Sequence, residues 1–386
     1  MIMTVLKEEI ENIEYEEKER AGASNRGLRN ADRNQNDEFY TQFSDIQAEI
    51  NAYLEFNPTL FKDKIVLLPC DDPEWSNFTK FFAQNFERFG LKKLISTSYA
   101  TNSKKYKTPV QLSLFELEDE RYNPEKSDIC GKIFMLQRNK DSSGKIDIND
   151  LEWDYLDGDG DFRSDEIKKL RDEADFIITN PPFSLFREFV SWLIESKKQF
   201  LIIGNVNAIS YKEVFPLIKD NLLWPGCRFN SRVNGKNMTF LVPPDYPLTG
   251  GETYTDEQGR KLISVAGTGW YTNIEHGRRH QPLPLMSMSD NIKFSKHKDI
   301  KGKEYKKFDN YDAINIPFTD AIPNDYDGLM GVPITFLSKY CPEQFEIIDG
   351  IGRYSVLNNE ETKKEGKYLS MVNGKPQYFR IIIRRK

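Results

Sequence analysis

The residues whose types and spacing most clearly indicate a chemical function are Asn180, Pro181, Pro182 and Phe183, which we call the NPPF turn. They directly follow the apolar run ADFIIT. Two prolines remove two backbone donors and fix φ, so the turn is rigid and its carbonyl groups point outward. The Asn180 side chain and the Pro181 carbonyl offer two acceptors, and Phe183 offers an aromatic face. Two acceptors can hold both N–H groups of an aromatic amine and favour a tetrahedral, nucleophilic nitrogen. The turn therefore suits methyl transfer to an amine, and the alternative is an ordinary strand-to-helix turn with Phe183 in the core.

A second candidate site lies shortly before this strand, in GDGDFRSDE. In nucleotide-binding doubly wound sheets, an acid at a strand end can accept from an adenine amine while an aromatic ring covers the base. Asp161 and Phe162 fit these two roles. The competing interpretation is calcium, because five residues match an EF-hand loop that starts at Tyr155, although an acid is expected there; a partial match also spans 139–150. The five are Asp157, Asp159, Gly160, Phe162 and Glu166.

A third candidate is the turn in IVLLPCDDPEWSNF, where an apolar strand ends at Cys70-Asp71-Asp72-Pro73. Such a turn and the helix that follows could hold the polar end of a cofactor. The glycine-rich pattern typical of dinucleotide sites is missing, so an Asp-Pro helix start is an equal alternative.

Alternating elements must position these residues. Buried strands alternate with helices along the chain, which predicts an α/β fold with a doubly wound, mostly parallel sheet. The expected strands are Lys64–Leu68, Lys93–Thr97, Phe176–Thr179 and Phe200–Val206. The expected helices are 37–56, an aromatic-rich segment that ends at Gly90, and Leu185–Glu195.

Changes in composition and pattern along the sequence predict three regions. Residues 1–36 are charged and polar and read as a mobile tail, whereas 37–225 contain the alternating elements and form the catalytic domain. Residues 102–150 are a polar interruption, which predicts loops or a small insertion. Residues 226–386 contain short strand-like runs with Gly, Pro and Asn turns, which predict a smaller mixed, hairpin-rich recognition region whose C-terminal strands return to the catalytic core.

The charge distribution favours a local contact with a polyanion. The formal net charge is −6, but residues 224–308 hold 14 basic and 8 acidic side chains, a net charge of +6. We interpret Lys296, Lys298, Lys301 and Lys303 as phosphate contacts, with a mobile solvated loop as the alternative. Arg228 and Arg232 lie on a predicted hairpin and have side chains of the kind that read base edges.

Other patterns exclude several classes. No apolar run approaches the roughly 20 residues of a membrane span, and the start of the chain lacks a signal-peptide pattern, so we expect a cytoplasmic protein without a membrane partner. The four cysteines are too widely spaced for a disulfide framework or a zinc knuckle. His276 and His280 lie in a basic loop, so we expect no metal there.

The NPPF turn matches the [DNS]-P-P-[YFW] signature of S-adenosylmethionine-dependent amino-methyltransferases. From about Asp37 to the C-terminus the chain resembles the EcoRI-type adenine-specific DNA methyltransferase family, most densely over 158–215. The strings that carry this resemblance are DEFYTQ, CDDPEWSNF, GLKKLI, GDGDFRS, TNPPFSLF, NVNAISYKEVF, YDAIN, GVPITFL and PEQFE.

The resemblance implies a Rossmann-like methyltransferase fold and a role for each motif. Asn180 and Pro181 would hold the target adenine N6, Phe183 would stack on that base, and Asp161 and Phe162 would contact the cofactor adenine. The turn at Pro69, Cys70 and Asp71, the PCD turn, would face the methionine part, with Tyr40 closing over it. In the wider methyltransferase superfamily the second strand usually ends in an acid that binds the cofactor ribose, whereas this chain has Ser96-Thr97-Ser98 there.

The implied activity is transfer of a methyl group from S-adenosylmethionine to adenine N6 in double-stranded DNA, at a short specific sequence and with flipping of the base. The implied context is a restriction-modification system, with a cognate restriction endonuclease acting separately. Two alternatives stay open: methylation of RNA or of a protein glutamine, and a DNA-binding module without catalysis.

Overall fold

The computed structural model describes residues 40–71, 76–100, 123–138, 152–229, 238–242, 252–256, 259–265, 267–352, 355, 357–359, 362–363 and 368–386. They form two compact units, one from 40–205 and 238–270 and the other from 206–229 and 271–386. The predicted tail, Arg232 and the calcium-like segment 139–150 lie outside the described residues. The described helices include none that is long and apolar enough to cross a membrane.

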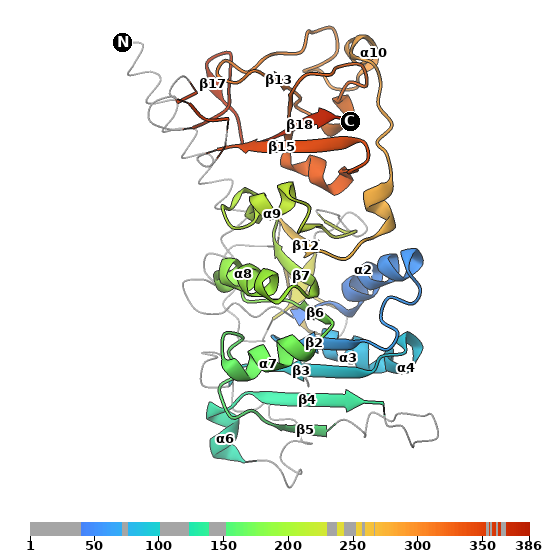
Figure 1. Cartoon of the computed structure of the whole chain (residues 1–386), viewed down its shortest axis with the longest axis vertical. Helices are drawn as coiled ribbons and strands as arrows, with labels where there is room; N and C mark the ends of the chain where they lie inside the picture. The colour runs from blue at the N-terminus through green and yellow to red at the C-terminus, as the bar shows by residue number, and fades with distance from the viewer. Residues whose placement is uncertain are drawn as a thin grey trace. The chain divides into compact units, whose positions relative to one another are not determined.

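The large sheet of the first unit is stacked in Figure 1 from β5 at the bottom up to β12. Its strands, in spatial order, are β5 (Glu152–Tyr155), β4 (Lys132–Gln137), β3 (Lys93–Thr97), β2 (Ile65–Leu68), β6 (Phe176–Thr179), β7 (Gln199–Asn205) and β12 (Thr268–Thr272). The four strands β3, β2, β6 and β7 are parallel, whereas β4 and β5 pair antiparallel. The predicted α/β class and parallel core are confirmed, in a sheet that is mixed overall.

The described helices of this unit lie between its strands along the chain. They are α2 (Phe43–Phe56), α3 (Asn77–Gln84), α4 (Phe86–Phe89), α6 (Pro124–Ile129), α7 (Asp165–Glu173) and α8 (Phe186–Ser196), with a 3-10 turn, η3, at Phe183–Leu185. The aromatic-rich helix divides into α3 and α4 and ends at Gly90, whose φ of 65° suits glycine. Phe61 packs edge-on against Phe82 and Phe176, which joins α3 to the sheet.

Of the two predictions for residues 102–150, loops or a small insertion, the described part fits the insertion. Their described part contains α6 and the six-residue strand β4, in which Ile133 and Leu136 are buried. A single short apolar run surrounded by polar residues gives a weak periodic signal, and pairing with β3 decides its structure.

The hairpin-rich segment belongs partly to the first unit. Strands β1 (Tyr40–Thr41), β9 (Thr239–Leu241), β11 (Lys261–Ser264) and β10 (Glu252–Thr255) form an antiparallel sheet in that order. The structure therefore divides the chain differently from a single boundary near 225, because β1, at the start of the predicted catalytic domain, pairs with β9 about 200 residues later.

The second unit has its own four-stranded sheet, β13-β14-β18-β15. The C-terminal strand β18 (Arg380–Arg385) pairs here with β14 (Met330–Pro333) and β15 (Phe345–Ile351), rather than in the catalytic core as predicted. The other elements are η4 (Val206–Ser210), α9 (Phe215–Lys219), β8 (Trp224–Pro225), η5 (Gly277–His280), α10 (Met288–Phe294), β13 (Ile314–Asn315), η6 (Thr319–Ala321), η7 (Ile334–Lys339), β16 (Met371–Val372) and β17 (Lys375–Pro376).

Candidate active site

The order of the large sheet reverses between β2 and β6. From β2 the chain continues to β3 on one side, and from β6 it continues to β7 on the other. Ligands of open α/β sheets bind at the carboxyl ends of the strands at such a switch point. Asp71 lies just past the end of β2 and Asn180 directly follows β6, so the fold brings two of the predicted motifs to this place.

The NPPF turn connects β6 to η3 and α8, as the sequence predicts. Pro181 is buried, whereas Asn180 and Phe183 are half-buried. The turn is closed behind Pro182 by a hydrogen bond from the Leu185 amide to the Pro182 carbonyl at 3.1 Å. The two half-buried side chains therefore stand on a rigid turn at the edge of the sheet.

The Asp71 carboxylate is held by hydroxyl groups. Asp71 is 4% exposed. Its Oδ1 accepts from Ser76 Oγ at 2.6 Å, and its Oδ2 accepts from Thr179 Oγ1 at 2.7 Å. Because Thr179 precedes Asn180, this carboxylate joins the PCD turn to the NPPF turn. Sequence reasoning missed Ser76 and Thr179, although Thr179 lies next to the motif.

The hydroxyl groups at the end of β3 also have partners within the unit. Ser96 Oγ donates to the Asp71 carbonyl at 2.7 Å, and Thr97 Oγ1 donates to the Pro69 carbonyl at 3.1 Å. Ser98 Oγ accepts from the Lys132 amide at 3.1 Å. The three residues at the position usual for a ribose-binding acid therefore hold the PCD turn and β4.

The segment of Tyr40 lies beside the PCD turn. Asn77, the first residue of α3, donates its side-chain N–H to the Thr41 carbonyl at 2.7 Å. Asn77 follows Ser76, which bonds to Asp71. The main chain at Tyr40 is thus near the turn that it was predicted to cover, and Cys70 in that turn is half-buried.

The GDGDF loop, 158–162, lies against the segment that follows β3, since the Ala100 amide donates to the Asp159 carbonyl at 2.7 Å. The Asp161 carboxylate forms an ion pair with Arg163, whose Nη2 lies 2.6 Å from Oδ2. Hydrogen bonds from the Arg163 side chain and amide lower the pKa of Asp161, which keeps it an ionised acceptor. Arg163 also pairs with Glu188 on α8 at 3.0 Å.

Phe162 is packed inward. Its ring is 4% exposed and makes edge contacts with Phe189 and Trp192, with centroid distances of 5.0 and 5.7 Å. This packing fixes the loop on α8. Stacking of the Phe162 ring on the cofactor adenine stays a prediction. The packing leaves little of the ring surface exposed for such a contact.

The same loop has a structure other than a calcium site. Both oxygens of Glu166 face the main chain, accepting from the amides of Asp157 at 3.0 Å and Gly158 at 3.1 Å. In an EF-hand the corresponding carboxylate binds the ion with both oxygens. The described residues contain no group of three or more His, Cys, Asp or Glu side chains placed to hold a metal ion.

Gly160 is required by the loop geometry. Its φ is +82°, and a Cβ there would lie 2.2 Å from the Ser98 carbonyl oxygen. We expect Gly160→Ala to lower the free energy of unfolding by more than about 1 kcal/mol. Gly259→Ala is the matched control, because Gly259 has a φ of +75° and, apart from its chain neighbours, no described residue has an atom within 4 Å of its Cβ position. Urea denaturation of both variants tests this, and equal decreases would contradict the close approach to Ser98.

Of the predicted DNA contacts, those among the described residues fall in the second unit. Lys296, Lys298, Lys301 and Lys303 are exposed after α10, and Arg228 is half-buried after β8. Lys296 pairs with Asp320 at 2.8 Å and Lys303 with Asp299 at 4.0 Å. The four lysines thus differ in whether a carboxylate already partners them.

His276 and His280 do not converge. His276 is buried beside the Pro225 carbonyl, and burial lowers its pKa to about 4. His280 instead bonds to Glu275 and Glu343 at its two ring nitrogens. Each imidazole therefore has a separate structural partner.

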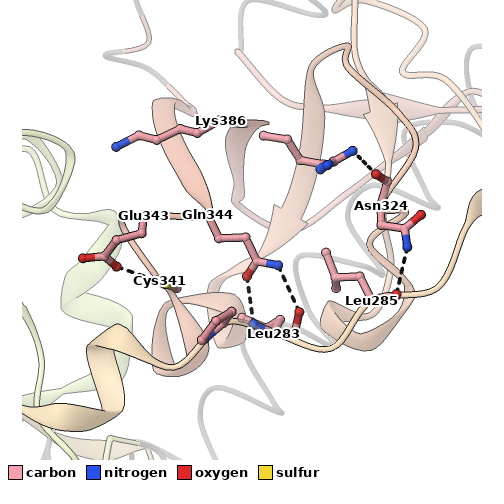
Figure 2. A pocket seen from close by; sticks show the side chains of 9 residues that line it. Leu283, Leu285, Asn324, Cys341, Glu343, Gln344 and Lys386 are labelled. Carbon is pink, nitrogen blue, oxygen red and sulfur yellow. Dashed lines mark hydrogen bonds between the residues drawn. The ribbon is translucent and has the colours of Figure 1, made fainter.

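Figure 2 shows a pocket of about 440 Å³ in the second unit that contains none of the predicted site residues. Gln344 spans one side of it by exchanging two hydrogen bonds with the main chain of Leu283. Glu343 accepts from Cys341 and His280, and these hydrogen bonds lower its pKa to about 2. The side chains of Gln344, Glu343 and Cys341 therefore already have hydrogen-bond partners within the protein.

Comparison with known proteins identifies the family of this chain. The family model described as "Adenine-specific methyltransferase EcoRI" matches residues 27–386. The Type II methyltransferase M.EcoRI of Escherichia coli is 42% identical over 94% of this chain and 98% of its own length. M.MpnI of Mycoplasma pneumoniae is 35% identical over 91% and 95%, and a Type II methyltransferase of Mycoplasma genitalium is 34% identical over 91% and 96%. No solved structure matches. The chain therefore belongs to the EcoRI family of adenine-specific methyltransferases.

Proposed function

We propose that this enzyme transfers the methyl group of S-adenosylmethionine to adenine N6 in double-stranded DNA, at one short sequence. The observation that carries the proposal is the NPPF turn at the carboxyl end of β6, at the switch point of the sheet, in a chain of this family. The context that we propose is a restriction-modification system with a separate endonuclease.

The residues present fit the cofactor. S-adenosylmethionine supplies a methyl group activated by a positively charged sulfur. Asp161, kept ionised by Arg163, is an acceptor for the exocyclic amine of the cofactor adenine. The PCD turn and the neighbouring segment of Tyr40 would hold the methionine part. Phe162 would contact the cofactor adenine from the GDGDF loop, which its packing against α8 holds in place.

The target adenine must leave the duplex, because its N6 is paired there. Flipping costs a few kcal/mol of pairing and stacking. Asn180 Oδ1 and the Pro181 carbonyl then accept the two N6 hydrogens, and Phe183 stacks on the ring. The rigid turn holds both acceptors in place before the base arrives, which reduces the entropy lost on reaching the reactive geometry.

The lysines after α10 would bind phosphates and not bases. Replacing Lys296, Lys298, Lys301 and Lys303 together by glutamine should weaken binding to cognate and non-cognate DNA by similar factors. The slope of log affinity against log salt concentration should decrease by up to about 0.9 for each phosphate that is no longer neutralised. The pair Lys298 and Lys301 should contribute more than Lys296 and Lys303, which must exchange a carboxylate for a phosphate. Fluorescence anisotropy at several salt concentrations tests this, and an unchanged slope would mean that the segment faces water only. Arg228 and Arg232 stay predicted base readers.

Two measurements separate the alternatives. Incubation with labelled S-adenosylmethionine and duplex DNA, structured RNA or a glutamine-containing protein shows which one receives the methyl group; we expect DNA alone. Isothermal titration with S-adenosylmethionine should show heat, whereas a DNA-binding module without catalysis should show none.

A further inference from the structure

A side-chain hydrogen bond connects β2 and β6 beyond the point where their main chains are paired. The registered pairs of these strands are Val66–Phe176 and Leu67–Ile177, so the ladder ends two residues before Thr179. Past that point, Thr179 Oγ1 donates to Asp71 Oδ2 at 2.7 Å. Thr179 is fully buried and Asp71 is 4% exposed. The bond therefore fixes the separation of two strand ends at the switch point.

The second carboxylate oxygen of Asp71 extends this connection to α3. Ser76 Oγ donates to Asp71 Oδ1 at 2.6 Å and, as the N-cap of α3, accepts from the Phe78 amide at 3.0 Å. The main chain of Asp71 is held as well. Its carbonyl accepts a hydrogen bond from Ser96 Oγ, and its amide donates to the Thr97 carbonyl. One carboxylate thus joins the PCD turn, the start of α3 and the end of β6.

A carboxylate buried in this way is costly unless its hydrogen bonds are made, and an apolar pair would fill the same volume at lower cost. A hydrogen bond, unlike an apolar contact, specifies both distance and direction. The direction matters here because Thr179 is covalently joined to Asn180. Any displacement of Thr179 is passed to the Asn180 side chain and to the Pro181 carbonyl.

We propose that Asp71 and Thr179 form a positioning pair, which holds the acceptors of the NPPF turn at a fixed place relative to the turn where the methyl donor binds. The inference rests on the proposed function. Methyl transfer requires nitrogen, methyl carbon and sulfur to align, and a misplacement of about 1 Å can cost about 100-fold in rate. Donor and acceptor sites follow different strands, so a connection between the strand ends controls that alignment.

The test is the single-turnover rate of methyl transfer, at saturating DNA and S-adenosylmethionine, in the full-length protein. Thr179→Val keeps the shape and removes the hydroxyl. We expect it to lower the rate by about 10- to 100-fold with the KM of both substrates little changed, because the Thr179 hydroxyl bonds to Asp71 and aligns the acceptors without itself contacting either substrate. Thr179→Ser retains the hydroxyl and should restore most of the rate.

The matched control is Thr268→Val. Thr268 is 8% exposed in the same unit, and its hydroxyl donates to the Val265 carbonyl at 3.1 Å. Both valine variants remove one buried hydrogen bond, so thermal melting should show decreased stability in both, with the larger decrease in T179V because its lost bond is to a carboxylate. The rate should fall in T179V only. If T179V does not fold, Thr179→Ala, which places no methyl group beside the carboxylate, provides the same comparison.

A wild-type rate in T179V would overturn the positioning pair, as would a decrease in rate that is equal in T268V or is not restored in T179S. Those results differ from failure of the proposed function, in which the wild-type protein itself would transfer no methyl group to DNA. That second result would overturn both proposals.

Discussion

Asn180→Ala should lower the rate of methyl transfer by two or more orders of magnitude, about 3 kcal/mol or more of transition-state stabilisation. The substitution removes one of the two acceptors for the N6 hydrogens and leaves the two prolines, and so the turn, in place. The amine would then keep its lone pair in the ring and stay a poor nucleophile. DNA affinity should change little, since phosphate contacts supply most of it. Single-turnover methylation and fluorescence anisotropy measure the two quantities.

Asn57→Ala is the matched control for this variant. Asn57 is exposed at the end of α2, and its Oδ1 accepts local hydrogen bonds from Thr59. This variant should methylate DNA at the wild-type rate. A rate close to wild type in Asn180→Ala would remove Asn180 from the proposed mechanism, whatever the behaviour of the control.

Asp161→Ala should weaken S-adenosylmethionine binding by roughly 1 to 3 kcal/mol, about 5- to 150-fold in Kd. The variant removes an ionised acceptor for the cofactor amine and leaves Arg163 with Glu188 as its remaining carboxylate. Isothermal titration measures the affinity. The effect should appear in binding, with the rate at saturating cofactor much less affected.

Asp165→Ala is the matched control, because the Asp165 side chain is 94% exposed and pairs only loosely with Lys168, at 3.6 Å. It should bind the cofactor as the wild type does. Unchanged affinity in Asp161→Ala would contradict the assignment. Loss of a calcium-dependent rise in Tm would instead favour the EF-hand interpretation.

Local patterns were sufficient to predict the core of the sheet. The strands Lys93–Thr97 and Phe176–Thr179 have the predicted bounds, and Lys64–Leu68 differs from β2 by one residue. Fully buried parallel strands are continuous apolar runs, so their signal is strong even in one sequence. The NPPF turn could be predicted equally well from the sequence, because two prolines after such an apolar run restrict the main chain by themselves.

The connections within the site could not be predicted in the same way. Asp71 and Thr179 are 108 residues apart, and their hydrogen bond depends on the order of β2 and β6 in the sheet. The sequence marked Asp71 as an acid in a turn, which fits a ligand contact and a structural contact equally well. Ser96 and Thr97 differ from the pattern of the wider superfamily, and their hydrogen bonds to the PCD turn are visible only in the folded chain.

Phe162 and the division into units illustrate the other limit. An aromatic residue after an acid in a loop fits a base-stacking role, but the packing of Phe162 against Phe189 and Trp192 is decided by the position of α8. Strand β1 pairs with β9 about 200 residues later, which places a hairpin segment in the first unit. The local composition of the sequence does not predict strand pairing over such a distance.

The most direct test of the proposed activity is to incubate the protein with mixed-sequence plasmid DNA and S-adenosylmethionine and to map N6-methyladenine by sequencing. We predict N6-methyladenine at a single short sequence, on adenines only, and none with Asn180→Ala. Unmodified DNA, or methyl groups on cytosine, would contradict the assignment of the NPPF turn as the site that holds adenine N6.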